Sequence, residues 1–235
     1  MVFFQNADDL AEFVGRKLVR REQARLLAGS GVDLDRFAST PLPPGPLRFL
    51  LIARLLGDKG VREFVEAARL LRRGGSDSRF QLLGPLDPAN RTGISRSELD
   101  GWVAEGAVDY LGETDDVRPF IADSHVVVLP SYREGLPRSL LEAAAMGRPL
   151  VATDVPGCRH VVKDGINGFL CAARDPASLA DAMRRMERMP PEQRAALGNA
   201  ARAKVQAEFS ETRVIQAYLE ALGDVALQPK APPRS

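Results

Sequence analysis

Two carboxylates bracket the most informative stretch of the chain, in which Glu134 and Glu142 lie eight positions apart. Between them a loop leads into a helical pattern, directly after an apolar run that ends at Leu129. Pro137 suits the first helical position, and Gly147 suits the position just past the last turn. The start of a helix attracts an anion, whereas flanking carboxylates can accept hydrogen bonds from hydroxyl groups. A nucleotide sugar, with phosphate in the middle and polyols at both ends, fits this arrangement.

A second group of candidate residues follows an earlier apolar run. Arg54 lies at the end of that run, and Lys59 lies at the entry to the next helical stretch. A guanidinium can hold two phosphate oxygens at once, and an ammonium is a compact point charge, so the pair could neutralise a diphosphate without a metal. The alternative is two surface cations on a loop. The similar placement of Glu134 after another run favours phosphate binding.

Glycines follow two further apolar runs, at Gly84 and Gly112. A glycine at such a position lets a flat ring approach the backbone, whose N–H and C=O groups can recognise the edge of a base. A plain tight turn explains each glycine equally well. The glycines therefore permit a base pocket without requiring one.

Short apolar runs alternate with helical patterns over most of the chain. The runs are uniformly apolar, as expected for strands that are buried on both faces. This alternation predicts an α/β fold with a doubly wound, Rossmann-like parallel sheet, in which ligands bind beyond the carboxyl ends of the strands. The predicted strands are Leu47–Ala53, Phe80–Leu83, Val108–Leu111, His125–Leu129 and Leu150–Thr153, and the predicted helices cover about 61–73, 95–105, 116–122 and 137–146.

The segments before and after the predicted sheet lack the alternation of strands and helices. One helical pattern lies near residues 7–17, and residues 176–223 are predicted to be entirely helical, as a C-terminal extension. A proline-rich stretch is stiff and extended and marks the best boundary, while the last residues have nothing to bury. The predicted divisions are an N-terminal segment 1–40, a linker 41–46, the ligand-binding domain 47–223 and a disordered tail 224–235.

The composition excludes several classes of protein. The 32 basic and 31 acidic residues nearly cancel, so nothing in the charge points to a nucleic-acid partner. Cys158 and Cys171 are predicted to be reduced, semi-buried thiols of a cytosolic protein. The first residues do not form a signal peptide, and no apolar run approaches the roughly 20 residues of a membrane span. We therefore expect a soluble, cytoplasmic chain.

Other chemically suggestive residues have simpler explanations. Asp33 and Asp35 spell a metal-binding Asp-x-Asp, but they precede a linker instead of ending a strand, so chance or a helix-capping role is favoured. His125 begins an apolar strand and is predicted to be a core or strand-end residue. His160 and Asp154 lie where a site role is permitted but not required. Arginines on an amphipathic helix are expected to form a solvated face, with peripheral membrane contact as the alternative, at positions 184, 185 and 188.

Three stretches of the sequence resemble one enzyme family. They are Arg54 to Gly60, the run Leu129-Pro-Ser-Tyr-Arg-Glu-Gly-Leu-Pro-Arg-Ser-Leu-Leu-Glu-Ala-Ala-Ala-Met-Gly-Arg-Pro149, and Ala152-Thr-Asp-Val-Pro-Gly157. Together they resemble the family-4 retaining glycosyltransferases, two-domain enzymes of the GT-B fold. The resemblance covers about residues 20–220 and is greatest to bacterial transferases that extend lipid-linked oligosaccharides of surface polysaccharide, commonly from a UDP-N-acetylhexosamine.

The resemblance implies a role for each matching residue. Arg54 and Lys59 would hold the diphosphate. Glu134 would contact the donor sugar and help to position its anomeric carbon, and these three residues would be the catalytic ones. Glu142 would accept hydrogen bonds from the ribose hydroxyls. The other donor-binding residues would be Gly135, Leu136, Pro137 and Arg138 beside sugar and phosphate, with Gly84, Tyr110 and Leu111 around the base.

The resemblance also implies a mechanism. The diphosphate leaves, the sugar passes through an oxocarbenium-like state, and the acceptor hydroxyl attacks on the same face, with the leaving phosphate as base. Cations of the protein and the helix dipole would stabilise the leaving group, so neither a metal nor another cofactor is expected.

Complete members of the family carry an N-terminal domain that binds the acceptor, and only residues 1–40 resemble the end of that domain. One hypothesis is therefore the donor-binding half of a transferase that acts on a lipid-linked acceptor at the cytoplasmic face of the membrane. The second is a truncated nucleotide-sugar binding module without catalysis. A third is a GT-B enzyme of another class, such as a phosphorylase or an epimerase; the lack of a recognisable lysine-anchored cofactor motif counts against the phosphorylase.

Overall fold

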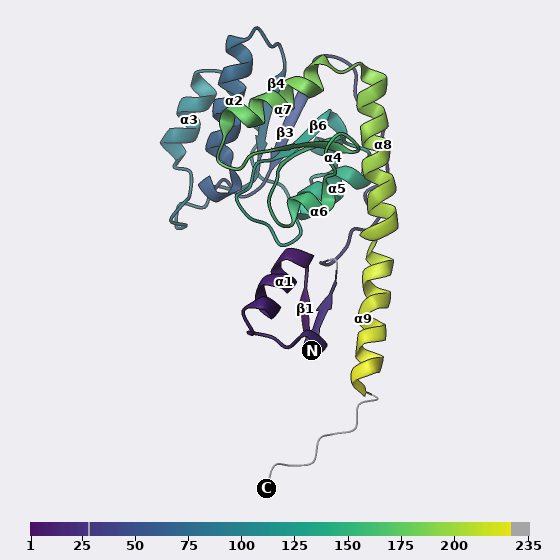
Figure 1. The fold of residues 1–235 in the computed structure, drawn as a ribbon. Coiled ribbons are helices and arrows are strands. Elements are labelled where there is room, and N and C mark those ends of the chain that lie inside the picture. The colour runs from purple at the N-terminus through teal and green to yellow at the C-terminus, as the bar shows by residue number, and fades with distance from the viewer. Residues whose placement is uncertain (28, 227–235) are drawn as a thin grey trace.

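The molecule consists of a small N-terminal unit, a central α/β domain and a pair of long C-terminal helices (Figure 1). The structure is a computed structural model that describes residues 1–27 and 29–226, with side chains to residue 223. In Figure 1 the N-terminal unit lies beneath the central domain, and the C-terminal helices run down one side of both.

The central domain contains a six-stranded sheet in which every neighbouring pair is parallel. Its order is β5-β4-β3-β6-β7-β8. The chain enters in the middle at β3, moves outward to β5 and then returns to the other side of β3 with β6. The direction of winding therefore reverses between β3 and β6, and this switch point is where ligands bind in doubly wound sheets. The strands are β3 (Arg48–Ile52), β4 (Arg79–Leu83), β5 (Asp109–Tyr110), β6 (Val126–Leu129), β7 (Leu150–Thr153) and β8 (Gly168–Cys171).

Alternate residues of the middle strands enter two hydrophobic cores, one on each face of the sheet. In β3, Phe49 and Leu51 lie in the core beneath α2, α3 and α7, whereas Leu50 lies in the core beneath α4, α5 and α6. Both cores exclude water from the strands, which explains why the runs are apolar without alternation. The helices are α2 (Val61–Arg73), α3 (Arg96–Ala104), α4 (Arg118–Asp123), α5 (Arg138–Ala145), α6 (Cys158–Val161) and α7 (Pro176–Arg188).

The predicted doubly wound parallel sheet is confirmed, and the predicted strands and helices differ from the observed bounds by at most two residues. The sequence did not reveal β8, which has only four residues and follows a run of turn-forming residues. Its first residue, Gly168, lies so close to β7 that a Cβ atom would come within 2.1 Å of the Leu150 carbonyl oxygen. The glycine that weakens the strand pattern is therefore required by strand pairing.

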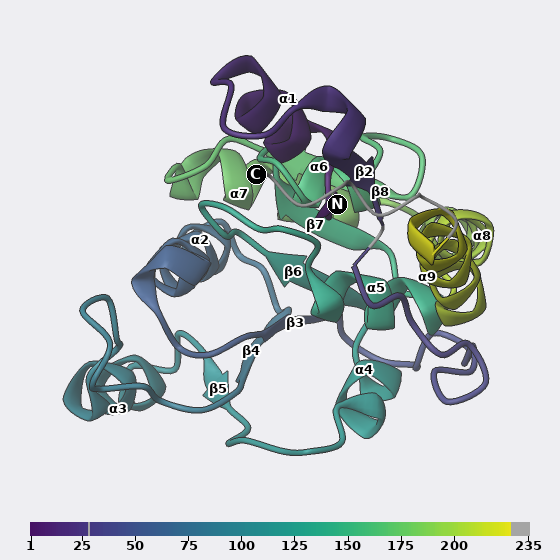
Figure 2. The ribbon, with the colours of Figure 1, turned by 90° about the horizontal axis from the view of Figure 1, so that it is seen from below.

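The N-terminal unit is more ordered than the sequence suggested. Besides the predicted helix, observed as α1 (Ala7–Gly15), it contains a parallel pair of strands, β1 (Val2–Phe4) and β2 (Ala24–Leu26). Three-residue strands offer too little pattern to be recognised from sequence. Figure 2 views the molecule from below, so this unit stands in front of the central domain, and its Asp8 Oδ2 lies 3.2 Å from Nε2 of His160 in α6.

The predicted C-terminal helical extension is confirmed. It comprises α7, α8 (Pro191–Glu208) and α9 (Glu211–Ala226), and Tyr218 of α9 contacts Phe3 of β1 edge to face at 5.2 Å between ring centroids. Helix α9 continues to Ala226, so the segment predicted to be a tail from residue 224 begins as helix; residues 227–235 lie outside the described part. Within the described residues no helix combines the length and the apolar character needed to cross a membrane.

A fully buried arginine fixes the start of the predicted linker. The Arg148 guanidinium donates hydrogen bonds to the backbone carbonyls of Ile121 (3.0 Å), Pro41 (3.1 Å) and Thr40 (3.0 Å). The Arg148 side chain has no exposed surface, and its burial lowers its pKa to about 10. Carbonyl oxygens thus take the place of a carboxylate partner, and we call these contacts the Arg148 clamp.

Both cysteines are buried and free, so their prediction as reduced thiols is confirmed, although they are less exposed than expected. Burial raises the pKa of Cys158 and of Cys171 to about 12. Because only the thiolate reacts, we expect native protein to resist iodoacetamide at pH 8 and unfolded protein to take up two labels. Mass spectrometry with and without denaturant measures this, and rapid labelling of the native state would contradict the buried placement.

Candidate functional site

The loops that follow β3 and β6 meet at the switch point of the sheet. The carbonyl oxygen of Asp58 accepts hydrogen bonds from the Tyr132 N–H (2.9 Å) and the Ser131 hydroxyl (3.2 Å). Gly60 has φ +73°, and a Cβ atom there would lie 2.1 Å from the Pro130 carbonyl oxygen. Only glycine permits this approach, and the two loops that carry the candidate residues are consequently held side by side.

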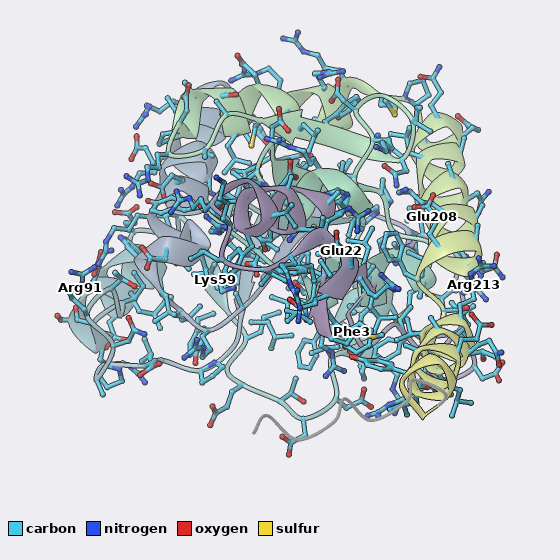
Figure 3. The ribbon with its side chains drawn as sticks, turned by 60° about the horizontal axis from the view of Figure 1, so that its bottom comes forward. Phe3, Glu22, Lys59, Arg91, Glu208 and Arg213 are labelled. Carbon is cyan, nitrogen blue, oxygen red and sulfur yellow. The ribbon has the colours of Figure 1, made fainter. Side chains whose placement is uncertain are left out.

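An ion pair joins the two loops at their centre. Lys59 Nζ lies 2.6 Å from Glu134 Oε1, and the two side chains are 26% and 12% exposed. Lys59 ends a short 3-10 helix, η2 (Gly57–Lys59), just before α2, and is labelled in Figure 3. The partial burial strengthens the attraction relative to a pair in open water. The structure thus brings the predicted phosphate-binding cation and the predicted sugar-contacting carboxylate together.

Arg54 has a partner that the sequence did not indicate. Its Nη1 atom lies 3.0 Å from Asp87 Oδ2, on the loop that follows β4. The contact uses one N–H group of a guanidinium that carries five, and the Arg54 side chain is 58% exposed. The loop of Asp87 is joined to the chain beyond Arg54, because Leu55 donates its N–H to the Pro85 carbonyl (2.9 Å) and accepts from Ile94 (3.0 Å).

Glu142 lies on α5, with Arg138 one turn before it. Arg138 Nη2 is 3.2 Å from Glu142 Oε1, and the Glu142 side chain is 12% exposed. Burial raises the pKa of Glu142, and the nearby Arg138 opposes that effect. Both side chains border a polar cavity of about 220 Å³ that Ser30 and Arg36 also line. The carboxylate therefore lies at the edge of a hollow in which hydroxyl groups could be bound.

The C-terminal end of α5 agrees with the sequence prediction, and the N-terminal end differs from it by one residue. Pro137 has extended backbone and caps the helix, so the prediction that it occupies the first helical position is wrong by one residue. At the other end Gly147 has φ +76° and donates its N–H to Ala144 (2.9 Å), and Arg148 donates to Ala143 (2.9 Å). This is the Schellman arrangement expected of a glycine stop.

The residues predicted to surround a base lie together at the ends of β4 and β5. The Tyr110 hydroxyl donates to the Gly84 carbonyl at 3.1 Å, and the Leu111 N–H donates to Leu82 at 2.9 Å. Gly84 has φ +142°, and a Cβ atom there would lie 2.0 Å from the Ala53 carbonyl oxygen. The close approach of two strand ends therefore requires this glycine, whether or not a base binds beside it.

His125 and Asp33, which were not assigned to the site from the sequence, have structural roles. His125 is buried, its Nδ1 accepts from the Arg48 N–H (3.2 Å), and burial lowers its pKa to about 4; it is a core residue, as predicted. Asp33 accepts the N–H groups of Asp35 and Arg36, both at 2.9 Å. It therefore caps a turn, whereas the sequence had suggested a helix cap.

The remaining candidates form surface pairs. Asp154 accepts from Arg159 Nε at 2.8 Å, and His160 Nε2 lies 3.2 Å from Asp8 Oδ2 in α1. Among the residues for which side chains are described, no group of three or more His, Cys, Asp and Glu could hold a metal ion.

The N-terminal unit contacts the loop of Glu134, which no feature of the sequence had indicated. The Asn6 Nδ2 atom donates to the Gly135 carbonyl at 2.9 Å, across 129 positions of sequence. A Cβ atom on Gly135 would lie 2.3 Å from Gln5 Oε1, and one on Gly157 would lie 2.4 Å from the Glu134 carbonyl oxygen. Gly157 could have been noticed as the end of the quoted Ala152–Gly157 stretch, whereas Gln5 and Asn6 match no local pattern.

Comparison with known proteins identifies a matching family and several relatives. Residues 46–188 match the family described as "Glycosyl transferases group 1". The chain is 31% identical over 207 residues, 82% of its length, to the putative colanic acid biosynthesis glycosyltransferase WcaL of Escherichia coli K12, and covers 50% of that protein. It is 32% identical over 172 residues, 73% of its length, to the N,N'-diacetylbacillosaminyl-diphospho-undecaprenol alpha-1,3-N-acetylgalactosaminyltransferase of Campylobacter jejuni, and covers 43% of that protein.

A solved structure is similar over nearly the whole chain. Sucrose-phosphate synthase from Thermosynechococcus elongatus superimposes with a TM-score of 0.83 at 26% identity, over 97% of this chain and 59% of that one. The GT-B character predicted from the sequence is thereby confirmed. The chain spans about half the length of the curated relatives it matches. By the match over residues 46–188, the chain belongs to the glycosyl transferases group 1 family.

Proposed function

We propose that the chain binds a nucleoside diphosphate sugar, in particular a UDP-sugar, at the switch point between β3 and β6. It would supply the donor-binding half of a retaining transferase that adds an N-acetylhexosamine to a lipid-linked saccharide. The single observation that carries this proposal is the Lys59–Glu134 pair at 2.6 Å. It places a cation suited to phosphate beside a carboxylate suited to sugar hydroxyls.

Each part of the proposed donor has a residue to bind it. Lys59 and Arg54 bind the diphosphate, and the free N–H groups at the start of α5 add a favourable dipole. Glu134 accepts hydrogen bonds from the sugar and fixes its anomeric carbon. Glu142 accepts hydrogen bonds from the ribose at the far end of the same loop. The base occupies the strand ends around Gly84.

In the proposed reaction the bond between the anomeric carbon and the phosphate oxygen breaks, and a bond to the acceptor oxygen forms on the same face of the sugar. The acceptor proton passes to the departing phosphate. This chain stabilises the charge that grows on the phosphate through its two cations and helix α5. Such preorganised partners act only as charge develops, which is how they lower the barrier.

The names of two relatives support the proposed sugar and acceptor. The Campylobacter relative is named for transfer of N-acetylgalactosamine to a diphospho-undecaprenol-linked sugar, and the Escherichia relative is named for colanic acid synthesis. A polyprenol diphosphate acceptor lies in a membrane, so the proposed place of action is the cytoplasmic face of the plasma membrane, with at most peripheral contact.

Calorimetric titration with a panel of nucleotides tests the donor proposal. UDP-N-acetylglucosamine and UDP-N-acetylgalactosamine are compared with UDP, GDP-mannose, ADP-glucose and uridine. We expect a UDP-sugar to bind most tightly, and EDTA to leave its affinity unchanged because protein cations replace Mg²⁺. Binding of none of these nucleotides would refute the proposal.

A binding module without catalysis is the alternative. A radiolabelled UDP-sugar incubated with polyprenol-diphosphate-sugar separates the two. Product formed by this chain alone excludes the inactive module. Donor binding without product supports it, and addition of an acceptor-binding half then shows whether turnover can be restored.

Replacing Glu142 by alanine should weaken UDP and UDP-sugar alike, by about tenfold each, because its partner is the ribose that both ligands share. One lost hydrogen bond to a charged group corresponds to a change of that size. Glu192→Ala is the matched control, since Glu192 is exposed in the first turn of α8 and does not border this cavity. Calorimetry measures both variants; unchanged UDP binding by Glu142→Ala would refute the assignment.

A further inference from the structure

A buried asparagine of the N-terminal unit connects a helix start to the loop of Glu134. Asn6 is 1% exposed. Its Oδ1 atom accepts the N–H of Asp9 at 2.8 Å and so caps α1, while its Nδ2 atom donates to the Gly135 carbonyl at 2.9 Å. The Asn6 side chain therefore accepts a hydrogen bond from an otherwise unpaired N–H group at the start of α1 and also donates a hydrogen bond to Gly135, the residue that follows Glu134.

The residue that precedes Glu134 is held by the same helix. The Arg133 guanidinium pairs with Asp9 and, at 3.3 Å, with Glu12, both on α1. Gln5 lies against the place where Gly135 has no side chain. Both neighbours of Glu134 are thus in contact with residues 5–12, which we call the N-terminal strap.

The loop has a second close neighbour. A Cβ atom on Gly157 would lie 2.7 Å from the Gly135 carbonyl oxygen, so that oxygen lies close to both Asn6 and Gly157. A glycine loses more conformational freedom on ordering than any other residue, and an external contact therefore matters most at such a position. The Asn6 bond supplies it directly at the Gly135 carbonyl.

We propose that Asn6 is a positioning residue that fixes the loop 133–136, and through it directs the Glu134 carboxylate toward the donor sugar. Asn6 acts through the Gly135 carbonyl and does not itself touch the donor. This inference rests on the proposed donor site for its consequence, but the loop contact can be tested without any ligand.

Two variants separate positioning from capping. Asn6→Ala removes both the cap acceptor and the donor to Gly135. Asn6→Ser keeps a hydroxyl that can cap α1 but lacks the amide group that reaches Gly135. Ser95→Ala is the matched control, because Ser95 caps α3 by accepting the Glu98 N–H (3.2 Å) away from the loop. The readouts are amide hydrogen exchange of residues 132–141 in the ligand-free protein, thermal unfolding, and calorimetry with UDP and UDP-N-acetylglucosamine.

We expect both Asn6 variants to exchange the loop amides faster and to lose about five- to tenfold in UDP-sugar affinity, with UDP affinity changed less than twofold. Asn6→Ala should lower the melting temperature more than Asn6→Ser does, because it also removes the helix cap. Ser95→Ala should lower the melting temperature for the same reason. Wild-type loop exchange in Asn6→Ser would overturn the proposal and leave Asn6 as a cap. If the wild-type chain binds no UDP-sugar, the donor proposal fails, while loop exchange still decides the role of Asn6.

Discussion

Replacing Lys59 by alanine is expected to weaken UDP binding on the order of 30- to 100-fold and to leave uridine binding within twofold of wild type. Two effects act in the same direction. The diphosphate loses a charge-assisted contact, which contributes about 2–3 kcal/mol. In addition Glu134, with a side chain only 12% exposed, loses its partner and presents an uncompensated negative charge to the phosphate. In a complete enzyme the barrier to transfer should rise by about 3 kcal/mol.

Calorimetry with UDP and uridine measures this difference directly. Lys59→Arg should recover part of the affinity, because it restores the charge with a different shape. Lys163→Ala removes an exposed lysine that lies just beyond α6 and serves as the matched control. Equal losses for UDP and uridine would show that Lys59 does not contact phosphate and would remove the main support for the donor site.

The second large effect concerns stability. Arg148→Ala is expected to lower the free energy of unfolding by about 3–5 kcal/mol, because it leaves a cavity and removes the donors on which the carbonyls of Ile121, Thr40 and Pro41 depend. The contact with the Ile121 carbonyl is buried and those with Thr40 and Pro41 are part-buried, so water replaces the guanidinium least readily at Ile121. Arg148→Met fills the same volume and should recover only the packing part of the loss.

Urea denaturation at pH 7 measures both variants. Arg188→Ala, at an exposed position near the end of α7, should change the free energy of unfolding by no more than about 0.5 kcal/mol. A loss below about 1 kcal/mol for Arg148→Ala would show that the Arg148 clamp does not hold the linker.

The sheet was predictable because the apolar sequences of its strands indicate burial on both faces. Leu50 and Leu51 are neighbours in β3 that enter opposite cores, and only a strand buried on both faces makes such a run apolar throughout. β8 lacked a continuous apolar run. Its pairing with β7 requires glycine at position 168, where a larger apolar residue would have indicated a strand. The three-residue strands β1 and β2 lacked it because of their length.

The candidate site was predictable as far as it follows the strand ends. Lys59 and Glu134 come from different loops, and the rule that parallel strands end at one edge was sufficient to bring them together. The partners Asp87 and Asn6 were not predictable, because no local pattern records which distant residue meets Arg54 or Gly135. The Arg54–Asp87 contact depends on how two loops of one domain pack, and the Asn6–Gly135 contact depends on how the N-terminal unit docks. Neither is encoded at a fixed spacing in the sequence.

The Arg148 clamp recognises its neighbours almost entirely through the peptide backbone, and this has a consequence for how such chains diversify. A carbonyl oxygen is present at every residue, whatever its side chain. A foreign segment spliced in just before the sheet domain would therefore offer the same oxygens to the guanidinium. Exchange of one half for another, in the laboratory or during evolution, can occur at this junction without rebuilding the joint.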